Sequence, residues 1–228
     1  MSMGRLVSKL WHFVQDPKRY LWIVAFKIFG SGITIQFYRR FMLPRNVRRI
    51  SRKDKINVIF LAMNTGMWKY DAVYKKLATD TRFNPVIVTA MRNIPNMELR
   101  LREQEAMVSY FSKRGFAVIR GYDPVARKWI SLNRLCPDII FYTQPYNGVI
   151  EHSFEYYCHL GSLLCYSPYA FLLGMAGWNW NSNLVQYCWQ VFYAVEAHLK
   201  ACAQFSRIGK ENAFATGYSF EEEYANCC

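Results

Sequence analysis

Three side chains in the second half of the chain have the types and spacing of an acid–base group. His152, Glu155 and His159 follow one another at intervals of three and four residues, so on a helix they would share one face. A carboxylate can orient an imidazole, which can then accept a proton from a hydroxyl group. His152 and Glu155 are therefore candidates for a base. The commoner meaning of such spacing is a polar face without chemistry, and a metal site is a third alternative.

A second candidate is the polar turn Asn64-Thr65-Gly66-Met67-Trp68, which follows an apolar run at 56–62. Backbone N–H groups at a glycine turn that opens a helix favour an anionic ligand. A turn that only joins a strand to a helix explains the same residues equally well. The sequence has no phosphate-binding glycine loop, no HExxH and no GxSxG motif. It therefore gives no reason to expect a metal or a cofactor.

The elements that would position these residues form an alternating pattern from residue 56 onward. Short apolar runs alternate with helical segments, which predicts an α/β fold with a Rossmann-like parallel sheet flanked by helices. The predicted strands lie at 56–62, 85–90, 116–120, 137–142 and 162–166.

Between and after these strands the spacing predicts helices. The segments are about 68–78, 97–114, a short helix from Asp123 to about Arg134, and a long aromatic amphipathic helix from Leu184 to Phe205. A further short apolar run lies at 213–215.

Ligands of open α/β sheets bind at the carboxyl ends of the strands. The loops after 56–62 and 137–142 are therefore the expected site, and the second loop carries Gln144-Pro145-Tyr146. We expect Trp68 and Gln144 to face one shared cleft, with the indole as an apolar wall and the amide as a partner for hydroxyl groups.

The net charge of +13 is concentrated at the N-terminus. Residues 1–55 hold thirteen Lys and Arg residues against Asp16 and Asp54. A nucleic-acid-binding protein would more often spread such residues over its folded domain, so we expect no nucleic-acid partner. Here the basic residues flank an aromatic and aliphatic stretch, which favours an anionic membrane surface as the partner.

That stretch, 21–38, is nearly long enough to span a bilayer but contains Lys27, Gln36 and a glycine break. We favour a basic amphipathic helix that lies in the membrane interface. Its aromatic anchors would be Trp11, Trp22, Phe26 and Phe29. The alternatives are a helix that packs on the domain core and a true membrane span.

Seven cysteines form an odd set without a CxxC pair. Reduced thiols are the simplest interpretation, and Cys227-Cys228 at the end is not expected to carry a lipid. Together with the basic segment, this predicts a cytoplasmic protein that is peripheral on the inner face of the cell membrane.

Four stretches taken together resemble a known family. They are residues 56–68, residues 70–88, residues 137–146 and Tyr166-Ser167-Pro168-Tyr169-Ala170-Phe171. In order and spacing they resemble the N-terminal domain of the CDP-glycerol glycerophosphotransferase-like family, two-domain Rossmann-type (GT-B) transferases that build cell-surface polymers such as teichoic acids and capsules. Thr216-Gly217-Tyr218 resembles the family's crossing point into its second domain, and Ser219-Phe220 departs from the usual continuation.

The resemblance implies an acceptor-binding half of a glycosyl- or glycerophosphotransferase. In that family the nucleotide donor and the catalytic histidines belong mainly to the C-terminal domain, so we expect this chain to need a separate C-terminal transferase domain for activity. By position, the acceptor-binding residues would be Asn64, Gly66, Met67, Trp68, Gln144, Pro145, Tyr146, Tyr166 and Tyr169. The acceptor would be lipid-linked, or a polyol or saccharide.

The expected organisation is a membrane-associating segment at 1–55, a Rossmann-like acceptor domain at 56–218 and a truncated tail at 219–228. The alternative is a non-catalytic membrane-surface protein that retains the fold.

Overall fold

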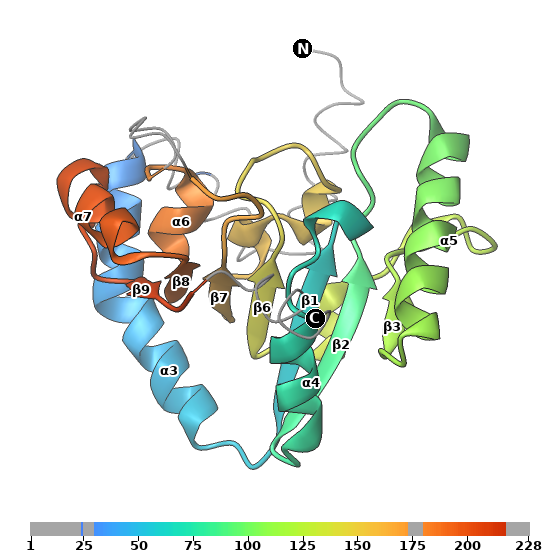
Figure 1. The fold of residues 1–228 in the computed structure, drawn as a ribbon, viewed down its shortest axis with the longest axis horizontal. Coiled ribbons are helices and arrows are strands. Elements are labelled where there is room, and N and C mark those ends of the chain that lie inside the picture. The colour runs from blue at the N-terminus through green and yellow to red at the C-terminus, as the bar shows by residue number, and fades with distance from the viewer. Residues whose placement is uncertain (1–23, 25–29, 173–179, 218–228) are drawn as a thin grey trace, which may run out of the picture.

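The computed structural model describes residues 24, 30–172 and 180–217, and within them seven strands form one sheet (Figure 1). The strand order is β3-β2-β1-β6-β7-β8-β9, and all neighbours are parallel. The strands are β1 (Ile56–Ala62), β2 (Phe83–Thr89), β3 (Val118–Arg120), β6 (Ile139–Tyr142), β7 (Leu163–Tyr166), β8 (Gln190–Tyr193) and β9 (Ala213–Ala215). The predicted α/β class with a Rossmann-like parallel sheet is confirmed.

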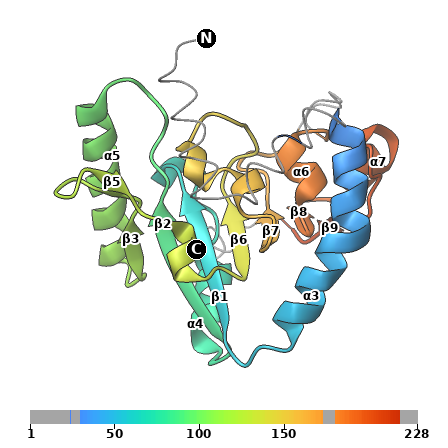
Figure 2. The same cartoon turned by 180° about the vertical axis from the view of Figure 1, so that it is seen from behind.

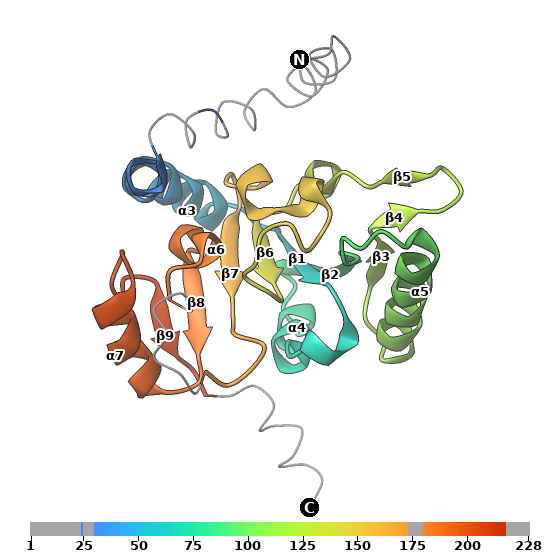
Figure 3. The ribbon, with the colours of Figure 1, turned by 90° about the horizontal axis from the view of Figure 1, so that it is seen from above.

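The apolar runs became strands because both faces of the sheet are covered. All but one of the residues of β1 are buried, as expected for a parallel strand with helices on each side. Figure 3 shows α3 (Leu43–Ser51) on one face of the sheet and α4 (Asp71–Thr79) on the other. α5 (Met97–Lys113) packs against β2 and β3 at one end of the sheet.

The chain changes once the side of the sheet to which it adds new strands. The chain adds β2 and β3 on one side of β1, and then crosses to add β6, β7, β8 and β9 on the other side. The loops at the carboxyl ends of β1 and β6 therefore diverge, which is the place where open α/β sheets form ligand-binding crevices.

The long helix predicted at 184–205 is wrong. The segment consists of α6 (Asn183–Tyr187), strand β8 and α7 (Glu196–Phe205). Figure 2 shows β8 between β7 and β9, so this segment extends the sheet by one strand. Its aromatic residues also fit helical spacing, but Val191 and Tyr193 are buried when they pair in the sheet. Tertiary pairing overrides the helical period here.

The short helix predicted from Asp123 to Arg134 is also wrong. A hairpin of β4 (Tyr122–Asp123) and β5 (Lys128–Trp129) occupies most of it, followed by the 3-10 turn Leu132–Leu135. The Asp123 carboxylate accepts hydrogen bonds from the backbone N–H groups of Val125 and Ala126, each at 2.9 Å. The side chain therefore caps a turn in the way that it would cap a helix.

Residues 30–51 form a helical segment that packs on the domain. Residues 30–37 are helical and continue through a π-helical turn at Tyr38–Met42 into α3. Tyr38 is fully buried and its ring lies 5.2 Å from that of Tyr187. The Tyr187 hydroxyl donates to the hydroxyl of Thr34 at 2.9 Å. Over these residues the structure therefore agrees with the alternative of core packing.

The aromatic anchors predicted further toward the N-terminus, Trp11, Trp22, Phe26 and Phe29, lie outside the described residues, as do 218–228. Within the described part of the chain, no helix combines the length and apolarity that a membrane span requires.

An ion pair fixes the end of this helical segment to the amino end of the sheet. Asp138 is only 1% exposed, and Lys53 Nζ lies 2.8 and 2.9 Å from its two carboxylate oxygens. Arg49 Nη1 approaches at 3.5 Å, and the backbone N–H of Asn57 donates at 3.1 Å. Two of the thirteen basic residues of the segment 1–55 thus stabilise the fold.

Candidate functional site

A cavity of about 190 Å³ lies at the carboxyl ends of β6, β7 and β8. Of the described residues that line it, half are aromatic and none is charged. The lining residues are Pro145, Tyr146, Tyr166, Pro168, Tyr169, Ala170, Phe171, Leu172, Ser182 and Tyr193. Four of the nine predicted acceptor-binding residues are among them, namely Pro145, Tyr146, Tyr166 and Tyr169.

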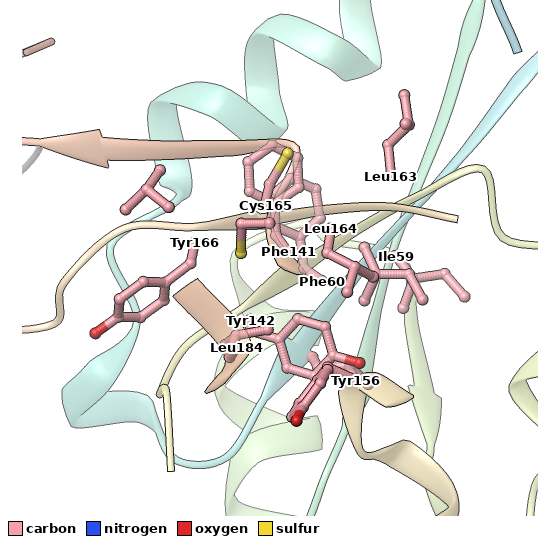
Figure 4. Close-up of a cluster of buried hydrophobic side chains, with 14 of the residues drawn as sticks. Ile59, Phe60, Phe141, Tyr142, Tyr156, Leu163, Leu164, Cys165, Tyr166 and Leu184 are labelled. Atoms are coloured by element: carbon pink, nitrogen blue, oxygen red, sulfur yellow. The ribbon is translucent and has the colours of Figure 1, made fainter. Parts of the chain in front are cut away.

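The tyrosine hydroxyls give this cavity its polar groups. Tyr146 and Tyr169 form a hydrogen bond between their side chains, which together with burial raises the pKa of Tyr146 to about 12. Tyr166 lies at the edge of the core cluster around Phe60 and Phe141, with its hydroxyl directed away from both rings (Figure 4). Burial raises the pKa of Tyr166. Both phenols are therefore neutral at pH 7 and able to donate hydrogen bonds.

Gln144 supports the cavity without lining it. The side chain is 3% exposed, and its Oε1 accepts a hydrogen bond from the backbone N–H of Tyr146 at 2.5 Å. That bond fixes the turn that presents Tyr146 to the cavity. Gln144 therefore holds a cavity-lining residue in place, whereas the sequence predicted that it would face hydroxyl groups itself.

The glycine turn after β1 lies outside the cavity wall. The Asn64 side chain accepts a hydrogen bond from the backbone N–H of Met67 at 2.9 Å and so caps the 3-10 turn Thr65–Met67. A Cβ at Gly66 would meet only the Asn64 side chain, at an ordinary 3.5 Å. Asn64, Gly66 and Met67 are thus accounted for as a strand-to-helix connection.

Trp68 is a core residue, and the expectation that it forms a cleft wall is wrong. The side chain is 4% exposed and its ring packs against Phe60 and Phe111 at 5.7 and 4.8 Å. The indole Nε1 donates to the carboxylate of Asp71. The 3-10 turn delays the start of α4 to Asp71, so Trp68 precedes the helix and its ring lies against Phe60 of β1 and Phe111 of α5.

The expected helix face of His152, Glu155 and His159 does not form. Two 3-10 turns, His152–Phe154 and Tyr156–Cys158, replace the helix. His152 Nδ1 lies 2.5 Å from the Tyr157 hydroxyl, and His159 Nε2 lies 2.8 Å from the carbonyl oxygen of Ser153.

Glu155 is tied to the backbone of a loop. It is 3% exposed, and its Oε1 accepts from the backbone N–H of Gly148 at 2.6 Å. Burial raises the pKa of the Glu155 carboxyl from 4.5 to about 7. The folded state therefore binds this proton more tightly than the unfolded chain does. The resulting stabilisation is complete below about pH 4.5 and declines as the pH rises to about 7. The arrangement favours a role in loop structure over a role as base.

One residue that the sequence analysis did not single out is Lys69. Its side chain is 4% exposed, and its Nζ lies 5.6 Å from the ring centres of Tyr70 and Tyr166 and 5.9 Å from that of Tyr169. Among the described residues Nζ has no hydrogen-bond partner, and burial lowers its pKa well below 10.5. Charged side chains are rarely buried without a partner. A lysine in a sequence is therefore expected to be exposed, and no sequence pattern predicts the burial of Lys69.

No model of a known protein family matches the chain, and no curated protein matches it. The resemblance to the CDP-glycerol glycerophosphotransferase-like family therefore stays a prediction.

Proposed function

We propose that this domain binds the hydroxyl-bearing acceptor of a glycosyl or glycerophosphoryl transfer at a membrane surface, and that a separate domain binds the nucleotide donor. The observation that carries the proposal is the tyrosine-lined cavity at the carboxyl edge of a Rossmann-like sheet. The resemblance of residues 56–171 to an acceptor domain supports the same function.

The cavity suits a small polyol or sugar. Aromatic faces pack against the C–H surfaces of a sugar ring, and neutral phenols can both donate to and accept from its hydroxyls. Its volume of about 190 Å³ lies below the roughly 300 Å³ at which pockets for drug-sized ligands begin. One monosaccharide or a short polyol is therefore the expected occupant.

The test of the cavity is direct binding of neutral ligands to the whole chain. We expect saturation-transfer NMR to detect binding of glucose, ribitol or glycerol. Replacing the half-buried Tyr169 with alanine removes one aromatic wall and the partner of Tyr146. The variant should bind about tenfold more weakly, equivalent to about 1.4 kcal/mol.

Tyr110→Ala is the matched control, because Tyr110 is an exposed tyrosine on α5 and does not line the cavity. Its binding should equal that of the unmodified protein. Equal losses in both variants, or no binding of any neutral ligand, would contradict the proposal.

The membrane part of the proposal is supported by the outer face of the helical segment 30–51. Ile33, Phe37 and Phe41 are exposed by 59, 48 and 45% although they are large and apolar. They recur every four residues, and the rings of Phe37 and Phe41 lie 5.3 Å apart. The basic residues Arg40, Arg45 and Arg48 on the same segment are exposed.

Vesicle sedimentation tests this surface. We expect the chain to bind vesicles with anionic lipid and to release them as salt rises. Neutralising the three exposed arginines should weaken binding roughly 100-fold, since each contributes about 1 kcal/mol near an anionic surface. The variant is Arg40→Gln, Arg45→Gln, Arg48→Gln.

The control variant removes the same number of positive charges from the other end of the sheet. It changes three exposed basic residues of α5 and the hairpin, namely Arg102, Lys113 and Arg127. All three are changed to glutamine. If both variants lose the same affinity, only net charge matters and the helix face is not the membrane-binding surface. Point variants are needed because a chain cut at residue 56 would expose the core that Tyr38 and Ile50 cover.

A non-catalytic membrane-surface protein is the second candidate function, and the same exposed helix face supports it. Activity separates the two. The chain would be combined with a C-terminal domain of the resembled family, using CDP-glycerol and nucleotide sugars as donors. Vesicle binding without sugar binding or transfer would favour the second candidate.

A further inference from the structure

Lys69 occupies a position that a lysine rarely takes in a folded protein. Its side chain is 96% removed from solvent, and among the described residues its Nζ has no hydrogen-bond partner. The exposed lysine Lys75, one turn along α4, instead lies 3.9 Å from the carboxylate of Asp71. An ammonium that has lost its water without gaining an acceptor destabilises the folded state. Such a group needs a compensating partner beyond the described residues, or a role that outweighs its cost.

The surroundings of Nζ connect it to the cavity. Of the three rings around it, those of Tyr166 and Tyr169 are also cavity walls, at 5.6 and 5.9 Å from Nζ. Aromatic faces attract a cation but supply no hydrogen-bond acceptor to it. Tyr169 is only partly buried and lies in the loop after β7. Of the three rings around Nζ, that of Tyr169 is the least buried, and we take it as the ring that moves when a ligand reaches Nζ.

We propose that Lys69 is the anion-recognition residue of the tyrosine cavity, and that the ligand is a small hydroxylated molecule carrying one phosphate or carboxylate group. The inference rests on the proposed function, since it names the acceptor's charge at that same cavity. An oxygen anion would supply the acceptors that Nζ lacks. The Tyr146–Tyr169 pair uses one of its two phenol protons for the hydrogen bond between the side chains, and the other phenol would donate to a second oxygen of the anion. The hydroxylated body would lie against the aromatic walls.

The electrostatics of the cavity favour a negatively charged group on its occupant. No lining residue among those that the structure describes is charged. A positive charge beside this wall therefore comes from Lys69, and an entering anion would favour the protonated form of its amine. The neighbouring phenols Tyr70 and Tyr166 have pKa values raised by burial. They therefore stay protonated at neutral pH and do not neutralise the ammonium. An anion entering this region gains an interaction that a neutral sugar does not.

The experiment compares ligands that differ at one carbon. Glucose, glucuronate and glucose 6-phosphate share a pyranose ring and differ in the group at C6, and inorganic phosphate tests the anion alone. We expect calorimetry at pH 7 to show at least tenfold tighter binding of one or both charged sugars than of glucose. The two charged sugars distinguish a phosphate from a carboxylate ligand. In Lys69→Met this preference should disappear while glucose binding remains.

Lys75→Met is the matched control and should keep the preference for the charged sugar. Lys69→Met should unfold at an equal or higher temperature than the unmodified protein, because it replaces a desolvated amine with an apolar side chain of similar length. Lys69→Gln is a second variant if the first fails to fold.

Equal binding of the charged and neutral sugars, or an unchanged preference in both Lys69 variants, would overturn the inference and leave the proposed function standing. Binding of inorganic phosphate that is lost in Lys69→Met, without binding of any sugar, would support the anion site and contradict the polyol acceptor. No binding of any probe would overturn both.

Discussion

Replacing Lys53 with methionine is expected to lower the free energy of unfolding by about 3 kcal/mol. The change leaves the carboxylate of Asp138, 1% exposed, without the ammonium at 2.8 and 2.9 Å. Arg49 at 3.5 Å is half exposed and compensates only in part. A buried charge that has lost its main partner costs several kcal/mol, which is a large fraction of a typical total of 5–15 kcal/mol. Urea unfolding followed by circular dichroism measures the change.

Two further variants identify the cause. Lys55→Met removes an exposed lysine two residues away and should change stability by less than about 0.5 kcal/mol. Asp138→Asn in the Lys53→Met background removes the stranded charge and keeps an oxygen for the backbone N–H of Asn57, so it should restore part of the loss. If Lys53→Met behaves like Lys55→Met, the ion pair does not hold the helical segment to the sheet.

The ion pair also shows why charge counting separated residues 1–55 from the domain. Charge counting cannot separate a lysine that meets a lipid headgroup from one that neutralises a buried aspartate, since the partner Asp138 lies 85 residues away. The segment contains basic residues that bond to the domain and basic residues that are exposed. Lys53, Arg49 and Arg39 bond to the domain, whereas Arg40 and Arg45 are exposed.

The sequence predicts best those strands whose residues are almost all buried. β1 lies at 56–62 as predicted, because a continuous apolar run bounded by polar residues has few other structures available. Hydrophobic periodicity does not predict the structure of segment 184–205, because a four-residue strand between two short helices is too short to show a period. Residues 190–193 form a strand because they pair with β7 on one side and β9 on the other.

The site was predictable in its location and less so in its side chains. Parallel strands end at one edge, and this places Tyr146, Tyr166 and Tyr169 around one cavity. The orientation of each side chain depends on local turns that spacing does not encode. Adjacent residues show this, since the indole of Trp68 packs against Phe111 of α5 while the amine of Lys69 lies among the tyrosine rings.

Replacing Trp68 with alanine is expected to lower the free energy of unfolding by about 4 kcal/mol. The indole fills the space between Phe60, Phe111 and Phe116, and no smaller side chain can do so without leaving a void. The Asp71 carboxylate would also lose the Nε1 donor. Urea unfolding should show a lower midpoint with little change in slope. Any loss of ligand binding should follow the fraction of unfolded protein, because Trp68 does not line the cavity.

Trp68→Phe retains most of the packing while it removes the hydrogen bond. It keeps an aromatic ring against Phe111 and loses part of the indole volume and the donor to Asp71, whose carboxylate retains Arg114 and Lys75 as partners. The loss should therefore be about 1–2 kcal/mol, and glucose binding at 10 °C should be unchanged. Tyr169→Ala is expected to give the opposite pattern, with weak binding and nearly normal stability. Weak glucose binding by a fully folded Trp68→Phe protein would indicate that the indole contacts the ligand. That result would contradict the assignment of Trp68 to the core.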